Sequence, residues 1–284
     1  MNGFLNVLKP PGMTAHDVVA YMRRRLGTKK IGHAGTLDPL AVGVLPLAVG
    51  NATRLLQYLR SGKEYLAEIQ FGIETSTADA EGEVLRQAPM PITEEQLREI
   101  LPRFRGAIQQ RPPMVSAVSI GGKRLYQLAR EGIEIERPLR DVTIEVLELV
   151  KFWPGEYPRA QVRVSCSAGT YIRSLAVDMA EALGGVASLA FLLRTRAGDF
   201  SLDDAATLDE DPRWVPLEDG VAHLPAHVAS ASEVEDIGHG RALQAGKGLK
   251  GEIVRVVDEA GELLAMAERR GDRLHPKLVL PRTP

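Results

Sequence analysis

Apolar and polar positions alternate with a period of two in several stretches of the chain. Residues 63–71 are the clearest case, because Tyr65, Ala67, Ile69 and Phe71 would share one face of a strand while the polar side chains share the other. We therefore expect Tyr65 to point into the core. Similar patterns predict strands over residues 4–8, 141–150 and 160–167, and an apolar run predicts a buried strand over 44–49.

Helical spacing of apolar residues follows Thr14. Thr14 can cap a helix by accepting a hydrogen bond from the Asp17 N–H, and Gly27 suits the left-handed residue that ends many helices. A first helix is therefore predicted between Thr14 and Gly27. Further helices are predicted over 51–59 and 93–104, and from the Gly169-Thr170 turn to about 183.

The chain is long enough for one large and one small domain, with 284 residues. Residues 201–220 are acidic, contain Pro212 and Pro216 and lack periodicity, so they are predicted to form a linker. Short strand signals punctuated by glycines follow, which predicts a small β-barrel. We predict a catalytic domain over 1–218 and a second domain over 219–284.

Positive charge is concentrated in two segments although the net charge is −2. Residues 1–63 contain nine basic and two acidic side chains, and residues 101–130 contain six basic side chains and no acid. Such local excess is the electrostatic signature of a surface that binds a phosphate backbone, whatever the total charge.

The cysteine content and the apolar runs limit the class of protein. The single cysteine, Cys166, allows no intramolecular disulfide and no cysteine cluster for a metal, so no metal site is predicted. No apolar run approaches the roughly 20 residues that span a bilayer, and no signal peptide is recognisable at residues 1–8. A cytoplasmic enzyme is the simplest interpretation.

The stretch 32–46 contains one acidic residue, Asp38, among small and apolar neighbours. Pro39 fixes its own φ and favours an extended Asp38, so the carboxylate should lie on a stiff loop. The loop alone favours a tight turn in which Asp38 accepts a hydrogen bond from a backbone N–H.

Residues 32–45 also resemble the catalytic loop of the TruB family of pseudouridine synthases, whose bacterial members act on uridine 55 of tRNA. The resemblance implies that Asp38 is the nucleophile. It also implies the pseudouridine synthase fold, an α+β fold with a mixed, mostly antiparallel central sheet flanked by helices. The reaction is an isomerisation, so no cofactor is expected.

Other segments resemble further motifs of the same family. Residues 9–14 are similar to the segment that buttresses the active-site loop, and Lys9 is a candidate substrate-binding residue. The Lys63-to-Tyr65 entry to the predicted strand implies that the Tyr65 ring stacks on the target base. From the residues alone, Tyr65 is equally a core tyrosine with a satisfied hydroxyl.

Residues 169–173 resemble the family's third motif, which implies that Arg173 pairs with Asp38. Independently, an arginine in the first turn of a helix opposes the helix dipole and needs a partner. Tyr171 beside it is a candidate substrate-binding residue. The segment around residue 193 resembles the one whose leucine packs under the flipped nucleotide, which we assign to Leu193. His33 either steers base flipping or merely stabilises its loop.

The segment 111–132 combines prolines, a Gly-Gly break and a predicted basic helix. It resembles the family's thumb, an insertion over about 108–136 that folds over the bound RNA stem-loop, with Lys123 and Arg124 as substrate-binding residues. The last domain, 219–284, resembles a PUA-type RNA-binding domain.

These resemblances imply a monomeric enzyme that binds the tRNA T stem-loop without a protein partner and flips the target uridine out. An ion pair with Arg173 should keep the Asp38 carboxylate charged. Attack at C1′ or at C6 both remain open, and Tyr65 or a water beside it is the candidate acceptor of the C5 proton. The alternatives are a guide-RNA-dependent synthase and a non-catalytic tRNA-binding or RNA-chaperone protein of the same fold.

Overall fold

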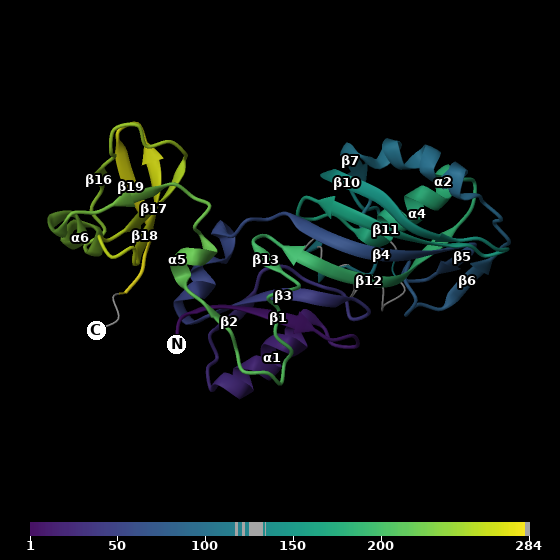
Figure 1. Cartoon of the computed structure of the whole chain (residues 1–284), viewed down its shortest axis with the longest axis horizontal. Helices are drawn as coiled ribbons and strands as arrows, with labels where there is room; N and C mark the ends of the chain where they lie inside the picture. The colour runs from purple at the N-terminus through teal and green to yellow at the C-terminus, as the bar shows by residue number, and fades with distance from the viewer. Residues whose placement is uncertain (117–118, 121–122, 125–132, 134, 282–284) are drawn as a thin grey trace.

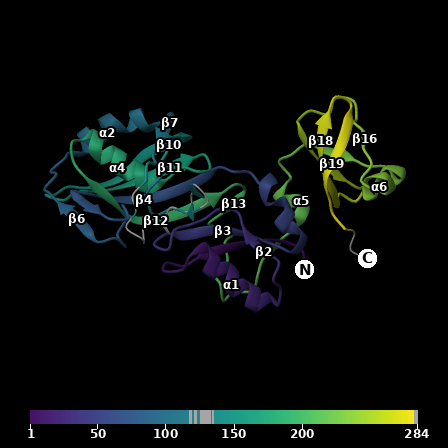
Figure 2. The ribbon, with the colours of Figure 1, turned by 180° about the vertical axis from the view of Figure 1, so that it is seen from behind.

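The computed structural model describes residues 1–116, 119–120, 123–124, 133 and 135–281. A large mixed sheet with its helices forms one part of the molecule, and a small sheet near the C-terminus forms the other (Figure 1). The two parts lie at opposite ends of the long axis, as the view from behind also shows (Figure 2).

The main sheet has ten strands in the described part of the chain, with the central order β14-β1-β3-β12-β4-β11-β10-β7. Its strands are β1 (Gly3–Lys9), β2 (Ile31–His33), β3 (Val42–Val49), β4 (Lys63–Phe71), β7 (Gly106–Gln110), β10 (Arg140–Trp153), β11 (Arg159–Cys166), β12 (Ala187–Ala197), β13 (Phe200–Ser201) and β14 (Trp214–Val215). Strand β12 pairs in parallel with β3 and antiparallel with β4, so the sheet is mixed and mostly antiparallel. The predicted fold class is confirmed.

Alternation along β4 has the expected consequence. Tyr65, Ala67, Ile69 and Phe71 are buried and belong to one apolar cluster with residues of β10, β11 and β12. Helices α2 (Glu94–Ile100) and α4 (Ile172–Ala182) contribute to the same cluster. Tyr65 therefore lies on the helix-covered face of the sheet.

Helix α1 (Ala15–Leu26) begins and ends where its caps predict. The Asp17 N–H donates to Thr14 Oγ1 at 3.0 Å, and the Thr14 N–H donates to an Asp17 carboxylate oxygen at 2.8 Å. Gly27 adopts the left-handed conformation with φ of 64°. The helix packs on β1, β2 and β3 through Val18, Val19 and Met22.

Two predicted helices are tighter or shorter than expected. The segment near 51–59 is a 3₁₀ helix, η1 (Gly50–Tyr58). The helix predicted over 93–104 divides into α2 and the 3₁₀ helix η2 (Leu101–Phe104), because Pro102 cannot donate the hydrogen bond that would continue α2.

Strands β5 (Ile73–Thr75) and β6 (Val84–Gln87) form a hairpin, and the loop between them carries Asp79 into the molecule. In the insertion, β8 (Ser119–Ile120) pairs with β9 (Lys123–Arg124). The predicted basic helix was therefore wrong for 123–124, where the backbone is extended. The rest of that prediction, over 125–132, lies outside the described residues.

The segment 201–220 was predicted to be a linker, and this prediction was wrong. The Leu8 N–H donates to the Ala206 carbonyl at 2.8 Å, the Ala206 N–H donates to the Asn6 carbonyl at 2.9 Å, and β14 pairs with β1. The segment thus completes the edge of the main sheet. Its partners are about 200 positions away in the sequence, so local periodicity does not predict these contacts. It ends in a short helix, α5 (Leu217–Gly220).

The C-terminal part is a five-stranded sheet with the order β15-β17-β18-β19-β16. Its elements are β15 (Ala226–Val228), α6 (Ala231–Gly238), β16 (Leu243–Gln244), β17 (Ile253–Val257), β18 (Leu263–Arg270) and β19 (Arg273–Val279). Within the described chain, its outer strands β15 and β16 do not pair with each other, so the predicted barrel is an open one. An open, small barrel of this kind is consistent with a PUA-like domain.

Candidate active site

Asp38 lies on the loop between β2 and β3, with buried neighbours on either side. Leu37 and Ala41 are anchored in the core, and the Ala41 N–H donates to the Asp38 carbonyl at 3.1 Å. The Asp38 side chain between these anchors is 35% exposed. The loop thus holds a partly exposed carboxylate on a fixed backbone.

Arg173 faces this carboxylate from the second residue of α4. Its Nη2 lies 2.9 Å from Asp38 Oδ2, while its side chain is only 4% exposed. The predicted ion pair between Asp38 and Arg173 is confirmed. A guanidinium at this distance forms a charge-assisted contact that fixes the orientation of the carboxylate.

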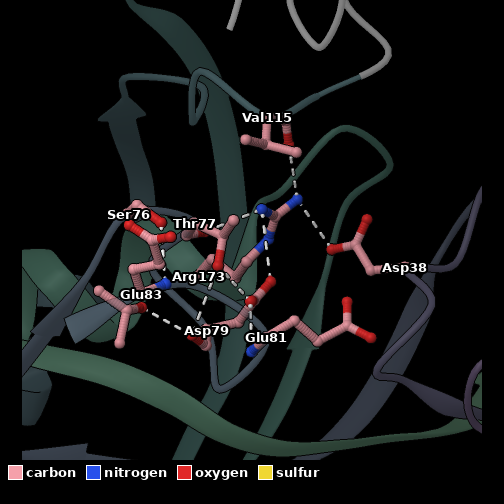
Figure 3. Close-up of polar contacts among 9 residues, drawn as sticks. Asp38, Ser76, Thr77, Asp79, Glu81, Glu83, Val115 and Arg173 are labelled. Atoms are coloured by element: carbon pink, nitrogen blue, oxygen red, sulfur yellow. Dashed lines mark hydrogen bonds and ion pairs between the residues drawn. The ribbon is translucent and has the colours of Figure 1, made fainter. Parts of the chain in front are cut away.

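The same guanidinium has three further partners, and Figure 3 shows two of them, Thr77 and Asp79, on the side away from Asp38. Nη1 donates to the Thr77 carbonyl at 3.0 Å and lies 3.5 Å from Asp79 Oδ2, and Nη2 donates to the Val115 carbonyl at 2.9 Å. These partners come from the β5–β6 loop and from the segment after β7. They leave the guanidinium little freedom to turn away from Asp38.

Asp79 was not predicted from the sequence. Its side chain is 5% exposed, and Oδ1 accepts hydrogen bonds from the Thr77 hydroxyl and the Glu81 N–H. It stands in a polar stretch that reads as a surface loop. The one available signal was that Arg173, at a helix N-terminus, needs acidic partners.

The Asp38 cavity has a volume of about 200 Å³. It is smaller than the roughly 300–1,000 Å³ of pockets for drug-sized ligands, so it suits a single extruded base. Its walls are Thr36, Leu37, Asp38, Lys63, Tyr65, Ser116, Gly169, Thr170, Tyr171, Ile172, Arg173 and Leu192.

Tyr65 forms part of the apolar wall and is 6% exposed. Burial raises the pKa of the Tyr65 phenol above its ordinary value of 10.0, while the nearby Arg194 guanidinium acts in the opposite direction. The phenol therefore keeps its proton at neutral pH, so the predicted role as C5 proton acceptor is disfavoured. A flat ring in the cavity wall fits the predicted stacking role.

Tyr171 caps the N-terminal end of α4 and lines the cavity as predicted. Its backbone is held by Gln110, which is 1% exposed. The Tyr171 N–H donates to Gln110 Oε1 at 3.0 Å, and Gln110 Nε2 donates to the Tyr171 carbonyl at 3.3 Å. Gln110 thus fixes the turn that presents both Tyr171 and Arg173.

The leucine in the cavity wall is Leu192 and not the predicted Leu193. Leu192 pairs across the sheet with Ala67 on the core face, whereas Leu193 pairs with Leu66 on the other face. Two adjacent leucines leave the face undecided from sequence, and a β-bulge between Leu189 and Phe191 shifts the alternation along β12.

Lys9 does not reach the cavity, which corrects its assignment to substrate binding. Its side chain is fully buried, and Nζ donates to the carbonyls of Pro10 at 2.9 Å, Met13 at 2.5 Å and Pro39 at 3.2 Å. Burial lowers the pKa of Lys9 to about 8, against the opposing effect of Asp38. Lys9 therefore buttresses the loop behind Asp38, as its motif implies, without contacting substrate.

Arg194 is a second buried cation that the sequence analysis missed. It is fully buried on β12 and donates from Nε to the Val44 carbonyl at 2.7 Å, from Nη1 to the Thr36 carbonyl at 3.1 Å and from Nη2 to the Gly35 carbonyl at 3.3 Å. One side chain thus ties both ends of the Asp38 loop to the central sheet. The available signal was a charged residue that directly follows the apolar run 189–193.

His33 faces a neighbouring cavity of about 430 Å³, and it does not line the Asp38 cavity. Burial lowers the pKa of His33 below its ordinary value of 6.5, so the ring is neutral at neutral pH. Within the described chain its Nδ1 is buried without a hydrogen-bond partner. Its predicted part in base flipping stays a prediction.

The backbone of Lys123 and Arg124 forms β9, but the predicted RNA contacts of their side chains lie outside what the structure describes. In the described ranges, no group of three or more His, Cys, Asp or Glu residues is arranged to hold a metal ion. Cys166 is buried, and burial raises the pKa of its thiol to about 11. Across the same ranges, no helix has the length and apolar character needed to cross a bilayer.

Comparison with known families gives two matches that together cover most of the chain. Residues 23–172 match the model of the TruB family pseudouridylate synthase N-terminal domain. The chain belongs to the TruB family of pseudouridine synthases. Residues 225–281 of this family member match the tRNA pseudouridine synthase II C-terminal domain.

Curated relatives agree with this assignment. The chain is 48% identical to tRNA pseudouridine synthase B of Moorella thermoacetica, over 98% of this chain and 97% of the relative. It is 51% identical to tRNA pseudouridine synthase B of Carboxydothermus hydrogenoformans, over 77% of each chain.

Two solved structures that superpose on this chain come from larger assemblies. A chain of a Cbf5-Nop10-Gar1 complex superposes with a TM-score of 0.74 at 30% identity, over 99% of this chain and 85% of that one. A chain of an H/ACA RNP bound to a substrate RNA containing 2′-deoxyuridine superposes with a TM-score of 0.73 at 28% identity, over 99% and 86%. The fold of this TruB-family chain is therefore the pseudouridine synthase fold.

Proposed function

We propose that this protein converts uridine 55 in the T-loop of tRNA into pseudouridine, with Asp38 as the nucleophile. The observation that carries the proposal is the 2.9 Å ion pair between Asp38 and the buried Arg173, in a cavity that suits one extruded base. A clamped carboxylate beside apolar walls is what attack on a nucleoside requires.

The reaction balances without a cofactor. The C1′–N1 bond breaks, the uracil turns, a C1′–C5 bond forms, the C5 proton leaves and N1 gains a proton. Asp38 supplies the electron pair for attack, at C1′ or at C6, and is released when the new carbon–carbon bond is complete. Tyr65 holds its proton and serves as a stacking surface, so the C5 proton passes to another acceptor, such as a water in the cavity.

The remaining residues position the substrate and the nucleophile. Arg173 orients the carboxylate through the 2.9 Å ion pair. Tyr65 and Leu192 pack against the faces of the flipped base, and Tyr171 borders the entrance. This arrangement retains the detached uracil close to C1′ until the bond is re-formed.

The similarity to curated tRNA pseudouridine synthases supports tRNA as the substrate, rather than an RNA target that a guide RNA selects. Identity is 48% to a tRNA pseudouridine synthase B along nearly the whole chain, against 30% and 28% to chains from the two larger assemblies. We therefore propose that the enzyme recognises the T stem-loop itself, without a guide RNA or protein partner, as a cytoplasmic monomer.

The C-terminal part serves as a PUA-like RNA-binding domain in this proposal. We place it over 219–284, with the thumb insertion over about 108–136 in the catalytic domain. This boundary falls within α5 (Leu217–Gly220), which joins the two domains.

Base-resolved pseudouridine mapping tests the proposal. Purified protein is incubated with an unmodified tRNA transcript and no guide RNA, and with a transcript in which cytidine replaces uridine 55. We expect pseudouridine at position 55 of the first transcript and at no position of the second. A requirement for guide RNA, or pseudouridine elsewhere, would contradict the proposed substrate, and tRNA binding without any modification would favour the chaperone alternative.

A further inference from the structure

Two cavities meet at Lys63, the first residue of β4. Lys63 lines the Asp38 cavity of about 200 Å³ and also the neighbouring cavity of about 430 Å³ that His33 faces. Its ammonium group lies against the catalytic loop, because a Cβ placed on Gly35 would be 2.9 Å from Lys63 Nζ. The ammonium group is thus part of the wall that the two cavities share.

The other cations near the Asp38 loop have partners within the protein. Arg173 contacts two carboxylates, and Lys9 and Arg194 each donate to three backbone carbonyls. For Lys63, no carboxylate or carbonyl within the described residues accepts a hydrogen bond from Nζ.

The surroundings of Lys63 disfavour its charge. Burial lowers the pKa of Lys63 to about 8, and the Arg194 guanidinium acts in the same direction. The Lys63 side chain is half-buried and lines the two cavities. Because no acceptor within the described residues pairs with Nζ, an anion that enters these cavities would be a favourable partner for it.

A nucleotide that enters the Asp38 cavity carries its phosphates on either side of the sugar, and phosphate is the anionic group of RNA. With the base in the Asp38 cavity, the backbone that leaves the nucleotide passes the shared wall where Nζ lies. We propose that Lys63 binds an RNA backbone phosphate adjacent to the target uridine. This rests on the proposed function, because it takes the extruded nucleotide as the occupant of the Asp38 cavity.

The phosphate contact has a thermodynamic signature that a structural lysine lacks. Each neutralised phosphate adds about 0.7–0.9 to the slope of log Kd against log salt concentration. Lys63→Met should therefore weaken tRNA binding at low salt and reduce this slope by about that amount. Lys63→Arg keeps the charge and should keep the wild-type slope.

The experiment measures Kd by filter binding of an unmodified tRNA transcript between about 50 and 400 mM KCl. The single-turnover rate at saturating enzyme is measured with the same transcript. The matched control is Lys151→Met, which removes an exposed lysine on β10 that packs over Trp153 and lines neither cavity. We expect Lys63→Met to weaken tRNA binding at low salt and to lower the salt slope, and Lys151→Met to leave the salt slope and the single-turnover rate unchanged.

An unchanged salt slope in Lys63→Met would overturn the inference, whatever happens to the rate. If the slope is unchanged and the saturating rate falls, Lys63 acts on the chemistry or on the fold and not on a phosphate. Absence of pseudouridine formation by the wild-type protein would instead contradict the proposed function, because the binding measurement does not depend on turnover.

A second measurement does not require Lys63→Met to fold. Wild-type affinity should fall as pH rises through about 8, while Lys63→Arg, which stays charged, should lack this part of the pH dependence. The titratable and charged groups that line the same two cavities are Asp38, Tyr65, Tyr171, Arg173, His33, Arg60 and Asp199, and Arg194 and Cys166 also act on Lys63. All of them, and Lys9 with its pKa of about 8, are the same in both proteins, so a difference between the two pH profiles reports Lys63. Equal pH profiles for the two proteins would overturn the inference.

Discussion

At the scale of residues, the site depends on one guanidinium that serves two carboxylates. Arg173 lies 2.9 Å from Asp38 and 3.5 Å from Asp79, and two carbonyl acceptors complete its shell. Asp79 and the Thr77 carbonyl hold Nη1, and the Val115 carbonyl shares Nη2 with Asp38 (Figure 3), so that the plane of the guanidinium is fixed with Nη2 toward Asp38. If Asp38 is the nucleophile, as we propose, its positioning depends on these residues as well as on Arg173.

Asp79→Asn tests this positioning role. The substitution keeps the shape of the side chain but removes a charged acceptor, and a hydrogen bond to a charged group contributes about 1.5–3 kcal/mol. We expect the single-turnover rate at saturating enzyme to fall about 10- to 100-fold, with tRNA Kd within about threefold of wild type. A wild-type rate in a correctly folded variant would show that Asp79 does not position Arg173.

Some site residues were predictable and others were not, for a physical reason. Asp38, Tyr65 and Arg173 stand in short motifs that resemble those of the TruB family, and this resemblance, more than the neighbouring residues alone, indicated their roles. Arg194 is defined by burial against carbonyls far away in sequence, such as that of Val44, 150 residues apart, and Lys9 by complete burial against the carbonyls of Pro10, Met13 and Pro39. A sequence window shows their charge and not their burial, so Lys9 was assigned to RNA and Arg194 was overlooked.

At the scale of elements, the Asp38 loop is fastened to three strands. Arg194 on β12 binds carbonyls at both ends of the loop, and Lys9 at the end of β1 binds the Pro39 carbonyl. Gly43 permits the close approach of β3 to β12, since a Cβ there would lie 2.2 Å from the Arg194 carbonyl oxygen. A rigid loop of this kind holds a nucleophile without a substrate-induced rearrangement.

Arg194→Lys tests whether the geometry of the Arg194 side chain, and not only its charge, stabilises the Asp38 loop. Lysine keeps a positive charge but cannot present three donors to carbonyls in different directions, and buried carbonyls left unpaired cost about 1–3 kcal/mol each. We expect the free energy of unfolding to fall by about 2–4 kcal/mol in urea denaturation. The control is Arg196→Lys, a half-buried arginine on the same strand, which should change it by no more than about 0.5 kcal/mol. If Arg194→Lys lowered the free energy of unfolding by as little as Arg196→Lys, this role of Arg194 would be contradicted.

Elements with strong local signals were predicted well. Strand β4 follows from its alternation and α1 from its two caps, because the residues that decide each element lie inside it. The linker prediction for 201–220 failed because the residues that this segment pairs with, Asn6 and Leu8, are distant in sequence. Leu192 and Leu193 show the same limit within one strand, where a bulge decides which side chain faces the cavity.

At the scale of the whole molecule, the two domains share apolar packing. One cluster joins Phe4, Val44 and Ala48 of the main sheet with Leu263, Met266 and Leu278 of the C-terminal sheet. Arg54 Nη1 also donates to the Val279 carbonyl at 2.9 Å. The C-terminal domain is therefore packed against the catalytic domain, which holds two RNA-binding surfaces in a fixed relation.

Substitution of Met266 tests this coupling. Met266→Ala removes fully buried atoms from the shared cluster, at a cost of about 2–5 kcal/mol. We expect faster amide hydrogen exchange in β3 of the catalytic domain as well as in β18. Leu274→Ala is the control, since Leu274 is equally buried but belongs to the C-terminal domain's own cluster. Exchange in β3 that responds equally to both substitutions, or to neither, would contradict the shared packing.

The central claim is that the carboxylate of Asp38 performs the chemistry. Pseudouridine formation releases the C5 proton, so tritium release from tRNA transcribed with [5-³H]uridine reports the reaction directly. Asp38→Asn preserves shape and removes the nucleophile, and we predict at least a roughly 10⁴-fold lower rate of release, with tRNA Kd within about threefold of wild type. Tritium release by Asp38→Asn at a rate near that of the wild-type protein would contradict the account.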